Sequence, residues 1–420
     1  MKFEVIGGKN CFGEIEVSGS KNNALKILAA SLLFKNPIII ENVPQIEDVF
    51  RMNELLKDLG VNIFFKNKNT FVLDSSKVKN FKLSFEIAKR LRASIALAGP
   101  LLGRFNQVVF PYPGGCIIGK RPVDIFLGSW KKMGANVSEK NDIFSLKAKK
   151  IKGVNIVFRL PSVTATETVI MTAVLGYGKT IIWNPAREPE VLALIDFLNA
   201  SGAKIFGAGT SKIEIIGTNG KLLEFKKPFK IIPDRIEAGS FLILGAALAN
   251  YLKIKNCNPD HLMNVIGILE DIGVSIKIGK NFLEVKKPKK LLACNIKTSE
   301  YPGFPTDLQA PFVVLMTQAY GQSMVFETIY DGRLNYVEDL NRMNAKITMC
   351  DPHRVIINGP TKLRSREIES PDLRAGLAFV LATLIAKGKS LIYNIYQIDR
   401  GYEKIEEKLQ KIGLNIRRIE

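Results

Sequence analysis

Hydrophobic and polar positions follow a pattern along the chain that recurs six times. In each copy a helix ends at a glycine or an asparagine, and a strand with β-branched residues follows. A helix ends most easily at a left-handed residue, a conformation that Gly and Asn adopt at little cost. Six turn residues occur at intervals of 68 to 74 residues: Gly60, Gly134, Gly202, Gly273, Asn344 and Gly413. Six units of about 70 residues therefore fill the chain.

Each unit also contains a nearly uncharged helix rich in small residues, followed by an apolar strand. We expect these helices at residues 24–33, 94–102, 169–175, 241–249, 311–319 and 377–385. Helices this apolar are buried on most sides, so the other helices and the sheets must surround them. The pattern predicts an α/β protein with helices packed inside sheets and three units per domain. We expect the domain boundary near residues 225–230, a charged stretch that contains a proline.

The composition of the 420-residue chain is that of a globular protein, with 46% hydrophobic and 24% charged residues. This balance excludes a disordered chain and a collagen-like repeat. Five cysteines without C-x-x-C spacing and only two histidines lead us to expect no disulfide framework, no metal site and no cofactor. The apolar stretches 241–252 and 375–386 are shorter than the about 20 residues of a membrane span, and no apolar leader opens the chain. We therefore expect a soluble, cytoplasmic protein.

The net charge of +20 suits an anionic partner such as a nucleic acid. However, 43 of the 60 basic residues are lysines and only 17 are arginines, which indicates a biased composition. A lysine-rich solvated surface explains the charge more simply than a nucleic-acid footprint does. We expect no nucleic-acid partner.

The segment 110–124 contains the most distinctive candidate for chemistry. Three glycines surround Cys116, and Lys120 and Arg121 follow it. Glycines and prolines predict a mobile loop, and nearby cations favour the thiolate form of an exposed cysteine. We therefore expect Cys116 to be reactive. The other cysteines lack such surroundings and are expected to be small buried hydrophobic residues: Cys11, Cys257, Cys294 and Cys350.

Polar clusters precede several of the buried helices. The segment 17–24 contains Lys21 at a predicted helix start, where free backbone N–H groups and the helix dipole favour an anion, although the same residues suit an ordinary helix cap. Similar clusters lie at 233–237, 305–309 and 371–375. If the units pack around pseudo-threefold axes, six cations would face one cleft that suits a phosphate ligand: Lys21, Arg92, Arg121, Arg235, Arg374 and Arg400. Taken singly, each arginine suits a salt bridge equally well.

Several segments along the whole chain carry a resemblance to a known family. The most discriminating is Pro113-Gly-Gly-Cys-Ile-Ile-Gly-Lys-Arg-Pro-Val-Asp124; the others are 19–25, 91–94, 186–190, 233–237, 304–309, 372–374 and 398–403. With these segments the chain resembles the enolpyruvyl transferases, and within them the branch that uses UDP-N-acetylglucosamine. The resemblance implies two similar inside-out α/β barrel domains. One is expected at 21–230 with Cys116, and the other at 1–20 plus 231–420 with Asp307 and Arg400.

The resemblance also implies a reaction. The enolpyruvyl group of phosphoenolpyruvate would pass to the 3-hydroxyl of UDP-N-acetylglucosamine by addition and elimination, with release of phosphate. This is the first committed step of peptidoglycan synthesis, on which the cell wall, cell shape and cell division depend. Both substrates are small molecules, and we expect the enzyme to be a monomer.

The resemblance assigns roles to individual residues. Cys116 would be the proton donor and would form a thioketal with phosphoenolpyruvate, on a loop that closes as a lid. Asp307 would either act as the base at the sugar hydroxyl or position that hydroxyl. Four residues would bind phosphoenolpyruvate, the first and last of them also with a catalytic role: Lys21, Asn22, Arg121 and Arg400.

The nucleotide sugar would contact a longer set of residues. By resemblance these are Arg92, Arg121, Pro122, Val123, Asp124, Ile125, Ser162 and Val163, with Asp307 and Ile329 at the sugar. Two positions depart from the family pattern: Leu160 stands where some relatives have a basic residue, and Gln397 where a histidine is frequent. We expect neither to touch the assigned groups.

Three other interpretations fit the sequence less well. The sister enzyme of the shikimate pathway, which uses shikimate 3-phosphate, lacks the Gly-Gly-Cys segment. A basic RNA-binding or RNA-end-modifying protein would show steeply salt-dependent binding, and its best support is the short run 225–230. An inert structural protein would leave the surroundings of Cys116 unexplained.

Overall fold

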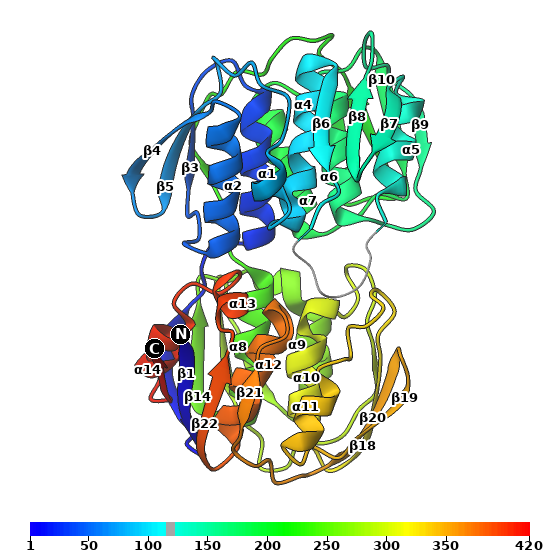
Figure 1. The fold of residues 1–420 in the computed structure, drawn as a ribbon. Helices are drawn as coiled ribbons and strands as arrows, with labels where there is room; N and C mark the ends of the chain where they lie inside the picture. Colours follow the sequence, from blue (N-terminus) through cyan, green and yellow to red (C-terminus); the bar gives the residue numbers. More distant parts are fainter. Residues whose placement is uncertain (115–121) are drawn as a thin grey trace. The chain divides into compact units, whose positions relative to one another are not determined.

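The computed structural model describes residues 1–114 and 122–420 (Figure 1). The described chain divides into two compact units. The central unit comprises residues 19–114 and 122–232, and the terminal unit comprises residues 1–18 and 233–420. The chain passes from one unit to the other at residues 18–19 and again at 232–233.

The central unit contains three sheets. Their strand orders are β13-β3-β5-β4, β6-β8-β7 and β11-β12-β10-β9. The strands are β3 (Ile38–Glu41), β4 (Asn62–Asn67), β5 (Thr70–Asp74), β6 (Gln107–Pro111), β7 (Asn136–Lys140), β8 (Ile143–Lys147), β9 (Asn155–Val157), β10 (Lys179–Trp183), β11 (Lys204–Phe206), β12 (Lys212–Ile216) and β13 (Phe229–Lys230). The helices are α1 (Lys21–Ala30), η1 (Ser31–Leu33), α2 (Glu47–Asp58), α3 (Phe85–Ala88), η2 (Arg92–Leu97), α4 (Ala98–Phe105), α5 (Asp124–Lys132), α6 (Val163–Val174) and α7 (Pro189–Ala200).

The terminal unit contains three further sheets, with strand orders β15-β16-β14-β2, β17-β18-β20-β19 and β21-β22-β1-β23. The strands are β1 (Lys2–Gly7), β2 (Cys11–Glu16), β14 (Ala249–Lys255), β15 (Ser275–Ile278), β16 (Phe282–Lys286), β17 (Ile296–Lys297), β18 (Gly321–Phe326), β19 (Ile347–Asp351), β20 (Arg354–Gly359), β21 (Glu367–Glu369), β22 (Gly388–Tyr393) and β23 (Asn415–Ile419). The helices are α8 (Arg235–Leu248), η3 (Pro259–Leu262), α9 (Met263–Asp271), η4 (Thr306–Leu308), α10 (Gln309–Met316), α11 (Val337–Arg342), α12 (Leu373–Ile385), α13 (Tyr396–Asp399) and α14 (Ile405–Lys411).

The apolar helices form the core of each unit, as the hydrophobic pattern predicts. In the terminal unit α8, α10 and α12 pack against one another, and every residue of α10 is buried. In the central unit α4 packs against α6, and η2 contacts both α1 and α6. The sheets and the amphipathic helices cover these bundles, which confirms the α/β fold with helices inside sheets. The helices begin earlier than their apolar runs because their first turns carry polar residues.

The six helix ends that define the repeat have the predicted conformation. The backbone φ angles of the turn residues run from +73° at Asn344 to +98° at Gly273. In all six, the next residue donates its N–H to the carbonyl five positions earlier, as Val61 does to Leu56 at 2.9 Å. This is the Schellman arrangement, which satisfies carbonyls at a helix end and needs a left-handed residue.

A second recurring left-handed residue was not recognised in the sequence. An asparagine follows the central strand of four sheets, at Asn42, Asn184, Asn256 and Asn394, with φ between +53° and +58°. Each side-chain amide donates to a backbone carbonyl of a neighbouring segment, at 2.7 to 3.1 Å. In the other two sheets, the strand that follows the buried helix is β6 or β18, and the next residue is Tyr112 or Glu327 instead of an asparagine; both contact candidate site segments described below.

The first residues of the chain complete the terminal unit. Strand β1 lies antiparallel between β22 and β23, so Glu4 faces Leu391 on one side and Arg417 on the other. Strand β2 pairs in parallel with β14. The two chain ends therefore lie close together, as Figure 1 shows.

The cysteines follow the sequence prediction only in part. Cys11 and Cys257 are buried, as expected, and Cys294 is half-buried. The expectation of burial is wrong for Cys350, which is exposed. Cys350 lies on β19, the outermost strand of its sheet, where its neighbours Met349 and Thr348 are exposed as well.

Candidate functional site

Six of the candidate residues share one structural position, the start of a buried helix. In the central unit Lys21 begins α1, Arg92 begins η2 ahead of α4, and Ser162 is the N-cap of α6. In the terminal unit Arg235 begins α8, Asp307 lies in η4 ahead of α10, and Arg374 is the second residue of α12. Free N–H groups and the positive end of the helix dipole favour anions at such positions.

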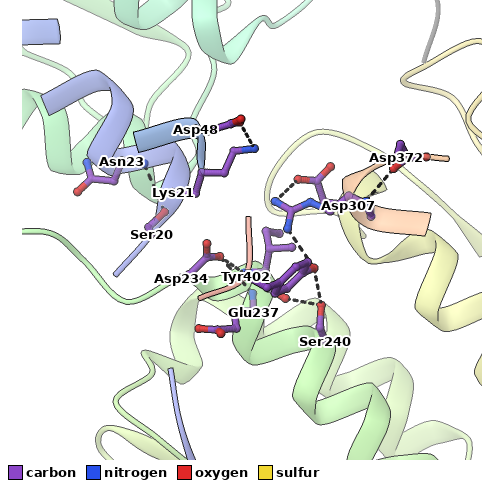
Figure 2. A network of polar contacts seen from close by, with 12 residues as sticks. Ser20, Lys21, Asn23, Asp48, Asp234, Glu237, Ser240, Asp307, Asp372 and Tyr402 are labelled. Atoms are coloured by element: carbon purple, nitrogen blue, oxygen red, sulfur yellow. Dashed lines mark hydrogen bonds and ion pairs between the residues drawn. The ribbon is translucent and has the colours of Figure 1, made fainter. Parts of the chain in front are cut away.

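Lys21 is held by an acidic partner that was not predicted. The Ser20 side chain caps α1 by accepting the Asn23 N–H at 3.3 Å. The ammonium of Lys21 lies 2.7 Å from a carboxylate oxygen of Asp48, in the first turn of α2 (Figure 2). Both side chains are almost fully buried. Asn22, the next residue of α1, is half-buried.

Arg92 contacts the chain just ahead of residues 115–121. Its guanidinium donates to the carbonyl of Pro113 at 2.9 Å and lies over the ring of Tyr112 at 5.8 Å. A cation over an aromatic face is attracted by the ring quadrupole, so both contacts hold Arg92 against this segment. Cys116 and Arg121, with the expected lid, lie outside the described residues.

Apart from Arg92, the predicted nucleotide-binding residues that the structure describes in the central unit lie at two helix starts. Val123 is the N-cap of α5, which begins at Asp124. Val123 is buried and Ile125 half-buried, whereas Pro122 and Asp124 are exposed.

The second of these helix starts is that of α6. The Ser162 hydroxyl accepts the N–H of Ala165 at 3.4 Å, and Val163 is the first residue of the helix. Leu160, two residues before this cap, is exposed.

In the terminal unit, the carboxylate of Asp307 lies between two buried arginines. Its two oxygens are 2.9 Å from Arg333 and 2.9 Å from Arg374. Burial is the largest influence on both guanidinium groups and lowers the pKa of each. The negative charge of Asp307, with smaller contributions, outweighs it, so the pKa of Arg333 and of Arg374 lies above the usual value. Both arginines are therefore charged, and the structure brings Arg374 and Asp307 together.

A hydrogen-bonded chain extends from this cluster (Figure 2). Asp372 caps α12 by accepting the N–H groups of Arg374 and Ala375. Arg374 donates to the hydroxyl of Tyr402 at 3.1 Å, and that hydroxyl is 3.4 Å from the hydroxyl of Ser240 on α8. Burial raises the pKa of Tyr402, which keeps its hydroxyl protonated. Tyr402 is two residues beyond Arg400, so the chain links the Arg400 segment to Asp307.

Arg400 is the C-cap of the short helix α13, and its guanidinium donates to the side-chain oxygen of Gln397 at 3.1 Å. The expectation that Gln397 touches none of the assigned groups is therefore wrong. One turn of helix brings residues three apart to the same face, so a residue at position 397 reaches the guanidinium.

Ile329 is held by the buried carboxylate of Glu327. Glu327 accepts the backbone N–H groups of Ile329 at 2.8 Å and Tyr330 at 3.2 Å. Its second oxygen accepts the hydroxyl of Thr306 at 2.8 Å. Because Thr306 precedes Asp307, one side chain ties the segments of both predicted sugar contacts together.

Sequence reasoning missed three of these partners, namely Arg333, Asp48 and Glu327. Arg333 offered a weak signal, since arginine is the rarer cation and this one directly follows Gly332. Asp48 and Glu327 offered none, because their roles depend on contacts between separate elements.

Within residues 1–114 and 122–420, no three His, Cys, Asp or Glu side chains are grouped as a metal ion would require. No helix in the same part of the chain combines the length and apolar character that crossing a membrane needs.

Comparisons with known proteins identify the family. The pattern of the EPSP synthase (3-phosphoshikimate 1-carboxyvinyltransferase) family matches residues 5–409. The chain is 42% identical over 415 residues to a UDP-N-acetylglucosamine 1-carboxyvinyltransferase of Campylobacter hominis, covering 99% of this chain and 98% of that protein. This chain belongs to the enolpyruvyl transferases.

Further relatives agree with this family membership. The enolpyruvyl transferase is 40% identical over 417 residues to a UDP-N-acetylglucosamine 1-carboxyvinyltransferase of Helicobacter pylori, with 99% and 98% of the two chains covered. Its fold matches that of the enolpyruvyl transferase NikO from Streptomyces tendae, with a TM-score of 0.90, 22% identity and 99% and 98% coverage. At that identity the likeness concerns the fold.

Proposed function

We propose that this enolpyruvyl transferase transfers the enolpyruvyl group of phosphoenolpyruvate to the 3-hydroxyl of UDP-N-acetylglucosamine and releases phosphate. The observation that carries the proposal is the identity of about 40% over nearly the whole chain to proteins named for this reaction. The Gly-Gly-Cys segment that ends at Cys116 supports the same acceptor over shikimate 3-phosphate. The reaction is the first committed step of peptidoglycan synthesis.

Phosphoenolpyruvate brings a phosphate and a carboxylate, so its binding needs several cations. We assign this role to Lys21, Arg121 and Arg400, with Asn22 as a hydrogen-bond donor. Charge-assisted hydrogen bonds contribute about 1.5–3 kcal/mol each, and they also stabilise charge that develops during addition. The position of Lys21 at the start of a buried helix supports its assignment, because the helix dipole adds to its charge.

Addition requires a proton on the methylene carbon of phosphoenolpyruvate and removal of a proton from the sugar hydroxyl. We assign the first transfer to Cys116, which also forms the thioketal with phosphoenolpyruvate. We assign Asp307 to the sugar hydroxyl. Two guanidinium groups stabilise the Asp307 carboxylate, which weakens it as a base. While Arg333 and Arg374 both contact Asp307, its main contribution is therefore to orient the sugar hydroxyl.

We assign binding of the nucleotide sugar to one set of residues in the central part of the chain and to two segments of the terminal unit. These residues are Arg92, Arg121, Pro122, Val123, Asp124, Ile125, Ser162 and Val163, with Asp307 and Ile329 at the sugar. The proposed roles are thus divided between the expected domains, 21–230 with Cys116 and 1–20 plus 231–420 with Asp307 and Arg400. We further propose a cytoplasmic monomer that needs no cofactor and binds no nucleic acid.

Phosphate release from phosphoenolpyruvate tests the proposal directly. The purified protein should release phosphate when UDP-N-acetylglucosamine is present and not when shikimate 3-phosphate replaces it. Release with shikimate 3-phosphate alone would transfer the assignment to the sister reaction. Release with neither acceptor would overturn the proposed function.

A further inference from the structure

Arg418, on the last strand of the terminal unit, holds both ends of the segment that carries Arg400. Its guanidinium donates to the two oxygens of Asp399 at 2.8 and 2.7 Å. The same guanidinium donates through Nε to Glu406 at 2.7 Å. Asp399 directly precedes Arg400, and Glu406 lies in the first turn of α14. One side chain thus anchors the backbone on either side of residues 400–405.

The segment between these anchors has little structure of its own. Helix α13 is a single turn of four residues, and helices this short are not stable in isolation. Before α14 the chain passes through Lys404 in the left-handed conformation, with φ +46°. The backbone position of Arg400 therefore depends on contacts with the rest of the unit. The ion pair between Asp399 and Arg418 is one of these contacts, and Asp399 is the residue directly before Arg400.

The side chain of Arg418 is itself held in place by the strand on which it lies and by a buried aromatic ring. Arg418 lies on β23, where it faces Phe3 of β1 in the antiparallel register. Its guanidinium also lies over the Phe3 ring at 5.1 Å, and Phe3 is fully buried. A planar guanidinium that meets a carboxylate with two hydrogen bonds is restricted in orientation as well as position.

We propose that Arg418 is a positioning residue for phosphoenolpyruvate binding. By binding Asp399 and Glu406, Arg418 fixes the backbone position from which the Arg400 side chain extends toward phosphoenolpyruvate. The inference rests on the proposed function, in which Arg400 is a phosphoenolpyruvate-binding cation. Displacing a substrate-contacting group by about 1 Å can reduce activity up to about 100-fold. Loss of the Arg418 contacts should therefore weaken the binding of phosphoenolpyruvate, the substrate assigned to Arg400.

Steady-state kinetics with both substrates varied tests this inference. Arg418→Ala should raise the KM for phosphoenolpyruvate about tenfold or more, with the KM for UDP-N-acetylglucosamine unchanged. Asp399→Asn, which weakens the same contact from its other partner, should give the same selective rise. Arg418→Lys keeps a charge but loses the two-pronged contact, so its KM should lie between those of Arg418→Ala and the unaltered enzyme.

Arg417 provides a matched control on the same strand. Its guanidinium hydrogen-bonds and ion-pairs with Glu4 of the neighbouring strand β1, whereas that of Arg418 pairs with Asp399 and Glu406. Arg417→Ala should leave both KM values unchanged. If Arg418→Ala and Asp399→Asn behave like Arg417→Ala, or raise both KM values alike, the inference is overturned.

A double variant separates positioning from general structural support. Arg400→Ala alone should raise the KM for phosphoenolpyruvate, and adding Arg418→Ala should then raise it little further, because the two losses act through one group. Fully additive effects would overturn the inference and leave the proposed function standing. Absence of phosphate release by the unaltered enzyme would instead mark failure of the proposed function.

Discussion

The ammonium of Lys26, on α1, lies 2.7 Å from a carboxylate oxygen of Glu167, on α6, and both side chains are almost fully buried. Lys26 is the one charge in an otherwise apolar helical run, so its pairing explains how that helix is buried in the core. Burial, the largest influence, raises the pKa of Glu167 to about 7, and the nearby carboxylates Glu188 and Glu190 act in the same direction. Lys26 opposes this shift without cancelling it.

This raised pKa makes the stability of the protein depend on pH. Because the folded-state pKa of Glu167 lies above its unfolded value of 4.5, the folded state binds more protons between these values. The stabilisation is complete below pH 4.5 and is lost as the pH rises to about 7. In the unaltered protein this titration should lower the free energy of unfolding by about 3 kcal/mol as the pH rises. Glu167→Gln stays neutral and should remove this pH dependence. Urea unfolding at pH 5 to 8 measures it.

Glu224 offers a control for that experiment, because it pairs with Lys35 at the surface and is largely exposed. Glu224→Gln should keep the pH dependence of the unaltered protein, since exposed pairs contribute about 0–1 kcal/mol. An equal slope for Glu167→Gln and the unaltered protein would show that Glu167 titrates normally.

The helix-end glycines allow a test of backbone conformation alone. A Cβ atom added at Gly60 or at Gly128 meets nothing within 4 Å, but Gly60 has φ +97° whereas Gly128 lies inside α5. We expect Gly60→Ala to destabilise the protein by about 1–2 kcal/mol, the cost of a left-handed residue with a Cβ. Gly128→Ala should instead stabilise it by about 0.5–1 kcal/mol, because alanine favours helix. Thermal or urea unfolding of the two variants should therefore shift in opposite directions.

Much of the fold could be predicted because its signals are local and repeated. A left-handed turn demands Gly or Asn at a fixed place, so residues such as Gly60 and Asn344 reveal the period and the helix ends. The apolar helices mark the core in the same way. The contacts at the candidate site could not be predicted in this way. Arg333 and Asp307, for example, are 26 residues apart in the sequence and belong to different structural elements. Such pairs depend on packing, which leaves no periodic trace in the chain.

Asp307 can be tested apart from the stability of its surroundings. We expect Asp307→Asn to lower kcat by about 10²-fold, the cost of a misplaced reacting group, because the neutral amide orients the sugar hydroxyl less well and binds the two arginines less strongly. The measurement is phosphate release with saturating substrates. Asp331→Asn is the control, since Asp331 is largely exposed and pairs with His353. Similar kcat values for Asp307→Asn and the unaltered enzyme would contradict the role assigned to Asp307.

The reactivity of Cys116 can be judged against a second cysteine in the same chain. We expect an epoxide phosphonate, which combines a thiol-reactive ring with an anion, to alkylate Cys116 and to leave Cys350 unmodified. Cys350 is exposed, so accessibility alone would favour its modification. Selectivity would therefore reflect the neighbouring cations and glycines that favour the thiolate at Cys116.

Peptide mapping after alkylation locates the adduct, and Cys116→Ser should remove it together with most turnover. Cys116→Asp should escape alkylation and, as a proton donor of another kind, retain activity. Equal labelling of Cys116 and Cys350 would show that the segment around Cys116 confers no special reactivity.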